Sequence, residues 1–305
     1  ALACFPASLE GLARAKPKGQ IEKRSLGQTG EMLSIVAMGG VVVMDVSATA
    51  ATGYVAEAID YGVNYFDVAP SYGNAEQMLG PALKPYRKDV FLACKTEARD
   101  RAGAMTALES SLKNLETDHF DLYQFHAVTK VEDAETILGP GGALEAFLQA
   151  REQGKIRFIG FSAHSVEAAM RLLDGYDFDT ILFPFNFRTW NVGNFGPQVL
   201  QKAKDKKMGI LGLKAMAAGP YAEGAERTPK CWYEPLKARE QARMGLRFAL
   251  SHPLTAAVPP GNEELFKMAL RLALEFEPLS NAEVEEIKQI AAAGKPLFEY
   301  PSAQA

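Results

Sequence analysis

The sequence predicts an α/β protein built as a (β/α)8 TIM barrel, and three observations support this prediction. Short β-rich runs alternate with amphipathic helical segments to the end of the 305-residue chain. The β-rich runs number eight, whereas a doubly wound sheet usually has fewer strands. The segment after the first run reads GGVVVMD and lacks the G-x-G-x-x-G motif of such sheets. A single parallel barrel therefore explains the pattern best.

A β-hairpin is expected before the barrel. Residues 22–35, EKRSLGQTGEMLSI, place Gly27 and Gly30 in a turn between two short strands. The eight barrel strands are predicted, in order, at residues 33–38, 63–66, 90–94, 120–125, 156–161, 179–183, 208–213 and 254–258.

Helices are predicted between these strands because apolar residues recur there at spacings of three and four, as at Met105 and Leu108. Each apolar helix face then needs a sheet to cover. Ser165 is a predicted helix N-cap, and Ser280 with Glu283 forms a predicted capping box.

One domain is predicted, from residue 21 to residue 305, because this length lies within the range of one large barrel. Residues 1–20 stand apart from it. They contain the A-x-A pattern of Ala13 to Ala15 followed by basic residues, so they are either the end of an export signal or a plain N-terminal extension. A cytoplasmic location is expected, with a periplasmic one as the alternative if the export signal is real.

The composition points to a small-molecule partner. Hydrophobic residues make up 48% of the chain and charged residues 23%, which is typical of globular proteins, and no apolar run is long enough to cross a bilayer. Because 33 Lys and Arg nearly balance 37 Asp and Glu, no positive field would attract nucleic acid or anionic lipid. Cys4, Cys94 and Cys231 have the spacing of neither a disulfide framework nor a metal site.

Polar residues after successive strands mark a candidate site, because reacting groups of parallel barrels lie at the carboxyl ends of the strands. Asp67, Lys95 and His126 follow the second, third and fourth predicted strands, and Tyr72 lies in the loop after Asp67. An ammonium near a phenol favours its ionised form and so makes it a stronger acid. Asp67 is the expected ion-pair partner of Lys95, and a neutral His126 would orient a carbonyl group. Because no nucleophile or metal accompanies these residues, the electrons must come from a cofactor.

The motifs that carry these residues resemble the aldo-keto reductase family. YFDVAPSYGNAEQMLG, FLACKTE and DLYQFHAV hold Asp67, Tyr72, Lys95 and His126 in the order of that family's catalytic tetrad. The resemblance runs from about residue 21 to residue 300, and it implies that the hairpin closes the bottom of the barrel. It also implies hydride transfer from NADP(H), or alternatively NAD(H), to an aldehyde or ketone, with Tyr72 as the general acid.

The resemblance leans toward a bacterial branch whose members can carry a C-terminal iron–sulfur extension. The residues up to Ala305 supply no cysteines for such a cluster.

Some contacts to the nicotinamide are implied by the same resemblance. Ser162 matches the serine of a Ser-Asn pair that holds the carboxamide, whereas Ala163 replaces the asparagine. Phe185 stands where the family often has a tyrosine that stacks on the nicotinamide ring, and Asn186 is a further expected polar contact.

Contacts to the phosphates are expected after the last two strands. Lys214 lies where the pyrophosphate would run, and Gly261 with Asn262 stands at a predicted helix start that suits a phosphate. The Lys or Arg expected for a 2′-phosphate is not evident after the eighth strand. The choice between NADP and NAD therefore stays open.

A substrate pocket is expected next to these residues. Residues 217–236 are too long for a simple connection and suggest a cover over the site. His164, Trp190 and Trp232 are the candidate pocket residues.

A second functional hypothesis is a nucleotide-binding redox sensor or regulatory subunit with negligible turnover. A barrel hydrolase or lyase would need a nucleophile, a carboxylate pair or a metal cluster at the rim, and the sequence offers none.

Overall fold

The computed structural model describes residues 19–301, and its central sheet is the predicted barrel of eight parallel strands. The order of the strands follows the sequence, and an isolated parallel bridge between Val36, two residues before the first strand, and Ala257 of the last strand closes the barrel. The strands are β3 (Met38–Gly39), β4 (Tyr65–Asp67), β5 (Phe91–Thr96), β6 (Phe120–Val128), β7 (Ile156–Ala163), β8 (Thr180–Pro184), β9 (Gly209–Leu213) and β12 (Ala256–Val258).

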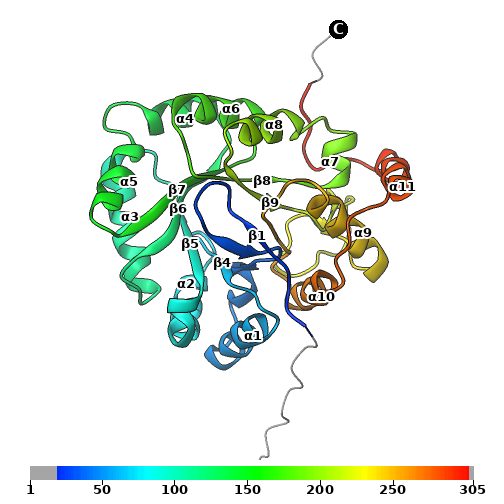
Figure 1. Ribbon diagram of the computed structural model, residues 1–305, viewed down its shortest axis with the longest axis horizontal. Coiled ribbons are helices and arrows are strands. Elements are labelled where there is room, and N and C mark those ends of the chain that lie inside the picture. Colours follow the sequence, from blue (N-terminus) through cyan, green and yellow to red (C-terminus); the bar gives the residue numbers. More distant parts are fainter. Residues whose placement is uncertain (1–18, 302–305) are drawn as a thin grey trace, which may run out of the picture.

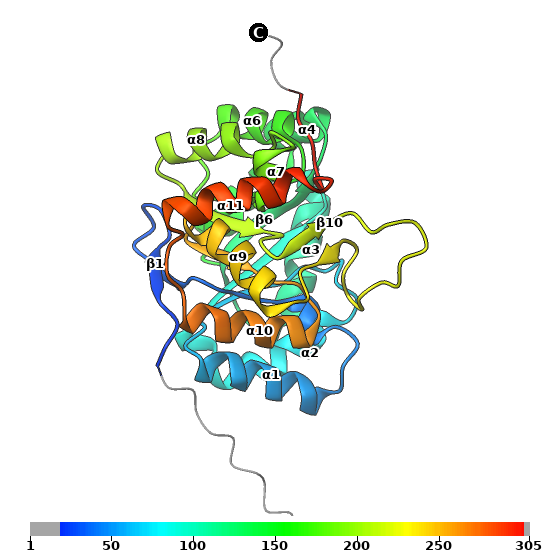
Figure 2. The same ribbon diagram turned by 90° about the vertical axis from the view of Figure 1, so that its right-hand side faces the viewer.

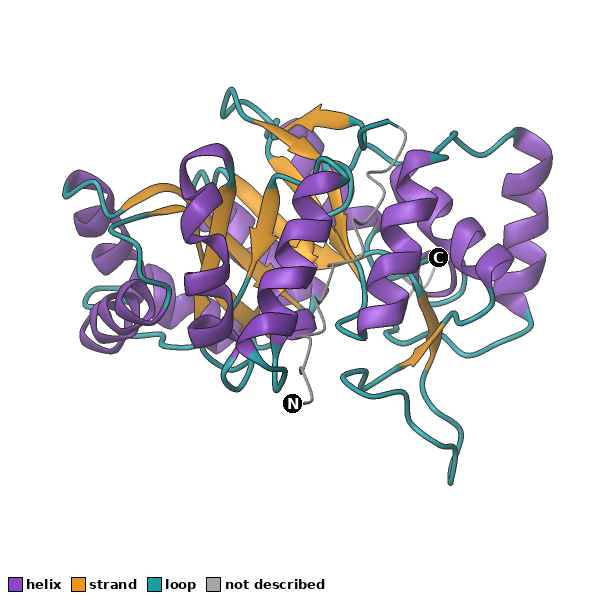
Figure 3. Ribbon diagram, turned by 90° about the horizontal axis from the view of Figure 1, so that it is seen from below, coloured by secondary structure: helices purple, strands orange, loops and turns teal. Residues whose placement is uncertain are grey.

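Helices surround the strands on the outside, as Figures 1 and 3 show. They are α1 (Ala48–Asp60), α2 (Ala75–Leu83), α3 (Arg101–Asn114), α4 (Val131–Leu138), α5 (Ala143–Glu152), α6 (Val166–Gly175), α7 (Phe187–Asn191), α8 (Pro197–Asp205), α9 (Arg239–Leu250), α10 (Glu263–Leu274) and α11 (Asn281–Ala292), with 3-10 turns η1 (Gly40–Val43) and η2 (Lys84–Asp89). Two predicted caps are confirmed: Ser165 caps α6, and Ser280 with Glu283 forms a capping box on α11.

The predicted hairpin covers one end of the barrel. It consists of β1 (Lys23–Ser25) and β2 (Met32–Ser34), which pair antiparallel and lie across the strands in Figure 1. Leu26 is fully buried in the cluster that fills the barrel interior. Gly27 has φ +54°, and a Cβ there would lie 2.3 Å from the backbone nitrogen of Gly209, so glycine permits this close approach.

The first predicted strand, residues 33–38, is wrong in its boundaries. Its start belongs to the hairpin strand β2, and only Met38 and Gly39 pair with β4. The reason is that this apolar run pairs with two different strands. Its start pairs with β1 in the hairpin, and its end pairs with β4 in the barrel.

The alternation of side chains along each strand separates two hydrophobic clusters. Tyr65, Phe91 and Leu122 point into the barrel, whereas their neighbours Phe66 and Leu92 pack against the helices. Asp67 and Lys95 continue the inward series toward the carboxyl ends of their strands. The period of two therefore directs charged side chains into the barrel mouth.

None of the helices formed by residues 19–301 combines the length and apolar character that a bilayer crossing requires.

Leu26→Ala tests whether the hairpin stabilises the barrel. Because Leu26 is fully buried in the interior cluster, its truncation should lower the free energy of unfolding by about 2–5 kcal/mol. Urea unfolding followed by far-UV circular dichroism measures this loss. Met32→Ala is the matched control, since Met32 is 49% exposed in the same hairpin and its truncation should change stability by less than about 0.5 kcal/mol. Equal effects of the two substitutions would contradict the conclusion that the hairpin stabilises the barrel through Leu26.

Candidate active site

A buried ion pair lies in the mouth of the barrel. The Lys95 ammonium donates to Oδ1 of Asp67 and to the carbonyl oxygen of Val68 at 3.2 Å, and the side chains of Lys95 and Asp67 are almost fully buried. The other carboxylate oxygen of Asp67 accepts from the Tyr65 hydroxyl at 3.2 Å and from the Gln124 amide at 3.1 Å. Both charged groups are therefore paired and hydrogen-bonded, as burial requires.

The Tyr72 phenol lies between Lys95 and His126. Its oxygen is 3.3 Å from the Lys95 ammonium and 3.5 Å from Nε2 of His126. On the other side of the imidazole, Nδ1 lies 3.3 Å from the Ser71 hydroxyl and 3.4 Å from a carboxylate oxygen of Glu97. The structure thus brings together the four side chains that the sequence selected.

A bulge in β6 places His126. Two residues of β6, His126 and Ala127, lie opposite Ser162 of β7, where the register shifts between Phe125 and Val128. Ala127 has φ +50°, and its N–H donates to the Ser162 hydroxyl at 2.8 Å. This hydrogen bond helps to hold Ala127 in its left-handed backbone conformation, next to the residue that carries the imidazole.

Burial shifts the ionisation of these groups. Burial, and after it the Lys95 ammonium, lowers the pKa of His126 to about 2, so the imidazole is neutral at pH 7. Burial also raises the pKa of the Tyr72 phenol, and the Lys95 ammonium opposes this rise. For Lys95 itself, burial disfavours the ammonium, but the Asp67 carboxylate and neighbouring groups outweigh it and raise the pKa. At neutral pH the site therefore contains a phenol, an ammonium and a neutral imidazole.

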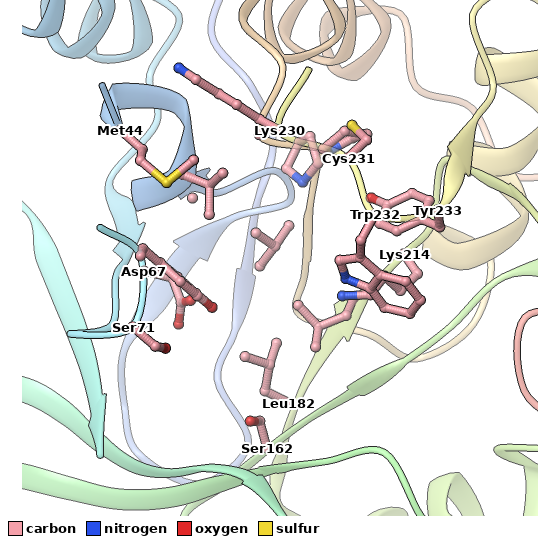
Figure 4. A pocket seen from close by; sticks show the side chains of 18 of the residues that line it. Met44, Asp67, Ser71, Ser162, Leu182, Lys214, Lys230, Cys231, Trp232 and Tyr233 are labelled. Carbon is pink, nitrogen blue, oxygen red and sulfur yellow. The ribbon is translucent and has the colours of Figure 1, made fainter. Parts of the chain in front are cut away.

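These groups open into a cavity of about 530 Å³. Figure 4 shows Met44, Asp67 and Ser71 along one side and Lys214, Trp232 and Tyr233 along the other. The further lining residues are Gly39, Val41, Tyr72, Lys95, His126, Ser162, His164, Leu182, Leu213, Arg227, Lys230, Cys231, Val258, Pro259, Pro260 and Gly261.

Part of this wall comes from the long segment after β9. It contains β10 (Ala217–Gly219) and β11 (Glu234–Pro235), which pair antiparallel, and the chain between them supplies lining residues from Arg227 to Tyr233. In Figure 2 this segment extends from the end of the molecule opposite the hairpin.

The sequence profile of the Aldo/keto reductase family matches residues 38–292. The chain belongs to the aldo/keto reductase family. It is accordingly an oxidoreductase, of a family that generally uses NAD(P)H.

Similar curated proteins come from bacteria and plants. The uncharacterized oxidoreductase YqkF of Bacillus subtilis is 33% identical over 159 residues, which are 47% of this chain and 49% of that protein. The match therefore spans about half the length of that relative. L-galactose dehydrogenase of Arabidopsis thaliana is 25% identical over 279 residues, 86% of this chain and 83% of that protein. Protein REDOX 2 of Catharanthus roseus is 31% identical over 258 residues, 77% of this chain and 78% of that protein.

Solved structures show the same fold. An aldo-keto reductase from Bacillus halodurans in its holo form superposes with a TM-score of 0.71 at 22% sequence identity, covering 92% of this chain and 98% of that one. At this identity the likeness supports the fold and nothing finer.

The cavity of this aldo/keto reductase suits an anionic nucleotide cofactor. Lys214 lines it with its ammonium 5.3 Å from the ring centre of Trp232, and no carboxylate within residues 19–301 forms an ion pair with it. Burial, followed by the charge of Lys95, lowers the pKa of Lys214 to about 8. Nε2 of His164 is buried in the cavity wall without a hydrogen-bond partner among the described residues. An unpaired cation and an unpaired polar atom are both available to a ligand.

The predicted cofactor contacts divide into two groups. Ser162, Lys214 and Gly261 line the cavity, and Asn262 lies just beyond it, where its side chain caps α10. A Cβ on Gly261 would lie 2.3 Å from Cγ1 of Val41, so the two loops meet closely there.

The structure does not bring Phe185 or Asn186 to the cavity. Leu182 of β8 points into the barrel, so Phe185, three residues later, lies on the opposite side of the chain and packs near Trp190 and Phe183. The Asn186 side chain caps α7 by accepting from two backbone N–H groups.

The candidate substrate residues also divide. His164 and Trp232 line the cavity, and Trp232 is 56% exposed at its edge. Trp190 instead contacts Phe248 and His252 away from it.

Sequence reasoning missed several residues of the site. Ser71 and Glu97 both lie against Nδ1 of His126. Ser71 directly precedes Tyr72 and Glu97 lies two residues after Lys95, and this proximity in the motifs was the available signal. Tyr65 and Gln124 could have been found from strand alternation, since each lies two residues before a selected residue.

His126→Asn should reduce the amount by which the free energy of unfolding falls when the pH is lowered. The folded pKa of His126, about 2, lies below the usual histidine pKa of about 6.5, so the unfolded chain binds more protons below pH 6.5 and stability falls as the pH falls. Between pH 7 and pH 5 this loss is about 2 kcal/mol. Urea unfolding at pH 7 and pH 5 measures it.

Ser71→Ala is the control for this measurement, because it removes a neighbour of His126 that does not titrate. It should leave the pH dependence of the wild type unchanged. If His126→Asn and the wild type lost equal stability between the two pH values, the imidazole would not be held neutral by burial.

Proposed function

We propose that the protein reduces aldehydes or ketones to alcohols with NAD(P)H, and that Tyr72 is the general acid. The observation that supports this most directly is the position of the Tyr72 hydroxyl, 3.3 Å from a buried ammonium and facing the cavity. A bound reduced nicotinamide supplies the hydride for such a reaction.

The residues of the chain handle the proton. As negative charge develops on the carbonyl oxygen, the O–H bond of Tyr72 breaks and its proton moves to that oxygen, which yields the alcohol. The phenolate left behind is stabilised by the Lys95 ammonium, and solvent restores the proton afterwards. General acid catalysis of this kind contributes about 10² to 10⁴ in rate.

The two flanking groups have separate roles in this proposal. Asp67 keeps Lys95 charged by pairing with it in a buried position. A neutral His126 can bear a proton on Nε2 and donate it in a hydrogen bond to the carbonyl oxygen, which orients the substrate beside Tyr72. Burial raises the pKa of Tyr72 and the Lys95 ammonium opposes this rise, so Tyr72 is protonated at neutral pH and can act as the acid.

The remaining lining residues hold the cofactor and substrate. In this proposal Ser162 contacts the carboxamide and Lys214 the pyrophosphate, and Gly261 and Asn262 contact phosphate; the support for it is that Ser162, Lys214 and Gly261 line the cavity and that Asn262 begins α10 beside it. Trp232 and His164 form the substrate side, and a small carbonyl compound is the proposed partner.

Tyr72→Phe tests the proton donor. The substitution removes the hydroxyl and should lower kcat by at least about 100-fold, while the dissociation constant of the reduced nucleotide stays nearly unchanged. Loss of nucleotide absorbance with a panel of aldehydes and ketones measures turnover, and fluorescence titration measures binding. Tyr86→Phe, in η2 and outside the cavity lining, is the matched control.

Two outcomes would contradict the proposal. Equal turnover by wild type and Tyr72→Phe would remove Tyr72 from the chemistry. A single stoichiometric oxidation of bound nucleotide with no steady state would instead favour the redox-sensor hypothesis.

A further inference from the structure

The proton of the neutral His126 imidazole can lie on either ring nitrogen, and its place decides what the ring can do. The nitrogen that bears the proton donates a hydrogen bond, and the other nitrogen accepts one. Nε2 lies 3.5 Å from the Tyr72 hydroxyl, whereas Nδ1 lies against the Ser71 hydroxyl and a carboxylate oxygen of Glu97. The neighbours of Nδ1 therefore influence which hydrogen bond Nε2 makes in the cavity.

We propose that Ser71 is a positioning residue that holds the proton of His126 on Nε2, and that Glu97 favours the opposite tautomer. The Ser71 hydroxyl does so by donating its own proton in a hydrogen bond to Nδ1. The consequence for catalysis rests on the proposed carbonyl reduction, because Ser71 acts on the reaction only through His126. The tautomer itself is measurable without turnover.

The two neighbours of Nδ1 favour opposite tautomers because of their chemistry. The Ser71 hydroxyl, 3.3 Å from Nδ1, can donate a hydrogen bond or accept one. The Glu97 carboxylate, with an oxygen 3.4 Å from Nδ1, can only accept, so it favours a proton on that nitrogen. Of the two, only the hydroxyl can therefore stabilise an Nδ1 that bears no proton.

Exposure to solvent favours Ser71 in this competition. The Glu97 side chain is 61% exposed, whereas the His126 side chain is 11% exposed. A carboxylate that lies mostly in water is already hydrated, so a hydrogen bond from the imidazole adds little to its stability. In water, moreover, a neutral histidine side chain prefers the proton on Nε2. We therefore expect the form with the proton on Nε2 to predominate in the free protein.

The tautomer also decides where the Tyr72 proton points. The phenol oxygen lies 3.3 Å from the Lys95 ammonium and 3.5 Å from Nε2 of His126. When Nε2 bears the proton, both neighbours are donors, so neither accepts the phenol proton, which is left for the carbonyl oxygen of a substrate. When Nε2 bears none, it accepts the phenol proton and withdraws it from the substrate. The form held by Ser71 is therefore the one that suits a general acid.

Other contacts hold the His126 backbone, so Ser71 is not needed to place the ring. The carbonyl oxygen of His126 accepts from Nη2 of Arg99 at 2.8 Å. The next residue, Ala127, donates its N–H to the Ser162 hydroxyl. Removal of the Ser71 hydroxyl should therefore change the tautomer and leave the position of the ring.

Nuclear magnetic resonance of the full chain, with isotope-labelled histidine, measures the tautomer directly. In long-range proton–nitrogen correlation spectra, a protonated and an unprotonated ring nitrogen resonate far apart, and His126→Asn assigns the signals of this ring among the four histidines. At pH 7 the wild type should show the proton predominantly on Nε2. Ser71→Ala should lower the ratio of the Nε2 form to the Nδ1 form by about fivefold, because one hydrogen bond to Nδ1 is lost.

Two related substitutions and a control isolate the role of the hydroxyl. Ser71→Thr keeps the hydroxyl and should retain most of the wild-type ratio. Glu97→Gln, added to Ser71→Ala, should recover part of the loss, because the competing carboxylate is gone. Ser110→Ala removes an exposed hydroxyl of α3 outside the cavity and should leave the ratio unchanged.

Kinetic measurements separate the tautomer from the reaction. With aldehydes, Ser71→Ala should lower kcat by about two- to fivefold and leave the dissociation constant of the reduced nucleotide unchanged, and Ser71→Thr should restore most of the rate. A wild type protonated on Nδ1, or a Ser71→Ala protein with the wild-type tautomer ratio, would overturn the inference. The expected tautomers in a protein that reduces no carbonyl compound would contradict the proposed reaction and preserve the role of Ser71.

Discussion

The buried pair of Lys95 and Asp67 is the interaction on which the arrangement of the site depends. A buried ammonium is tolerated only with an anion and full hydrogen bonding, and here Asp67, the Val68 carbonyl oxygen and the Tyr72 hydroxyl supply both. Asp67 is held in turn by side chains from β4 and β6. Three neighbouring strands thereby fix the position of one ammonium and, through it, the surroundings of the phenol.

The fold produces this geometry from two backbone features. The period of two along β4 and β5 directs Asp67 and Lys95 into the barrel, whose interior below them is filled by apolar side chains and plugged by the hairpin. The bulge at His126 and Ala127 then interrupts the regular pairing of β6 with β7 at the level of the site. The barrel supplies rigid positions, and the irregular ends of its strands supply reactive groups.

The loops after the last strands set a different kind of constraint, which is a balance of charge. Lys214 lines one side of the cavity and forms no ion pair within residues 19–301, whereas Lys230 is paired with Glu263. In the proposed function, the unpaired Lys214 meets the pyrophosphate of a nucleotide, whereas the paired Lys230 holds the covering segment against η1 and α10. Lysine thus serves two purposes at the barrel mouth, and the presence or absence of a carboxylate partner decides which one a given lysine serves.

The sequence by itself determined the barrel, the hairpin, two helix caps and the choice of Asp67, Tyr72, Lys95 and His126 as neighbours, because strand period and motif spacing are local properties of the chain. It misjudged the limits of the first strand, where one apolar run serves two partners, and it could not decide on which side of the chain Phe185 lies. The pairing of Lys230 with Glu263 joins two segments that no local pattern relates. Only the tertiary structure decides such contacts, because they depend on how a long connection folds back over the barrel mouth.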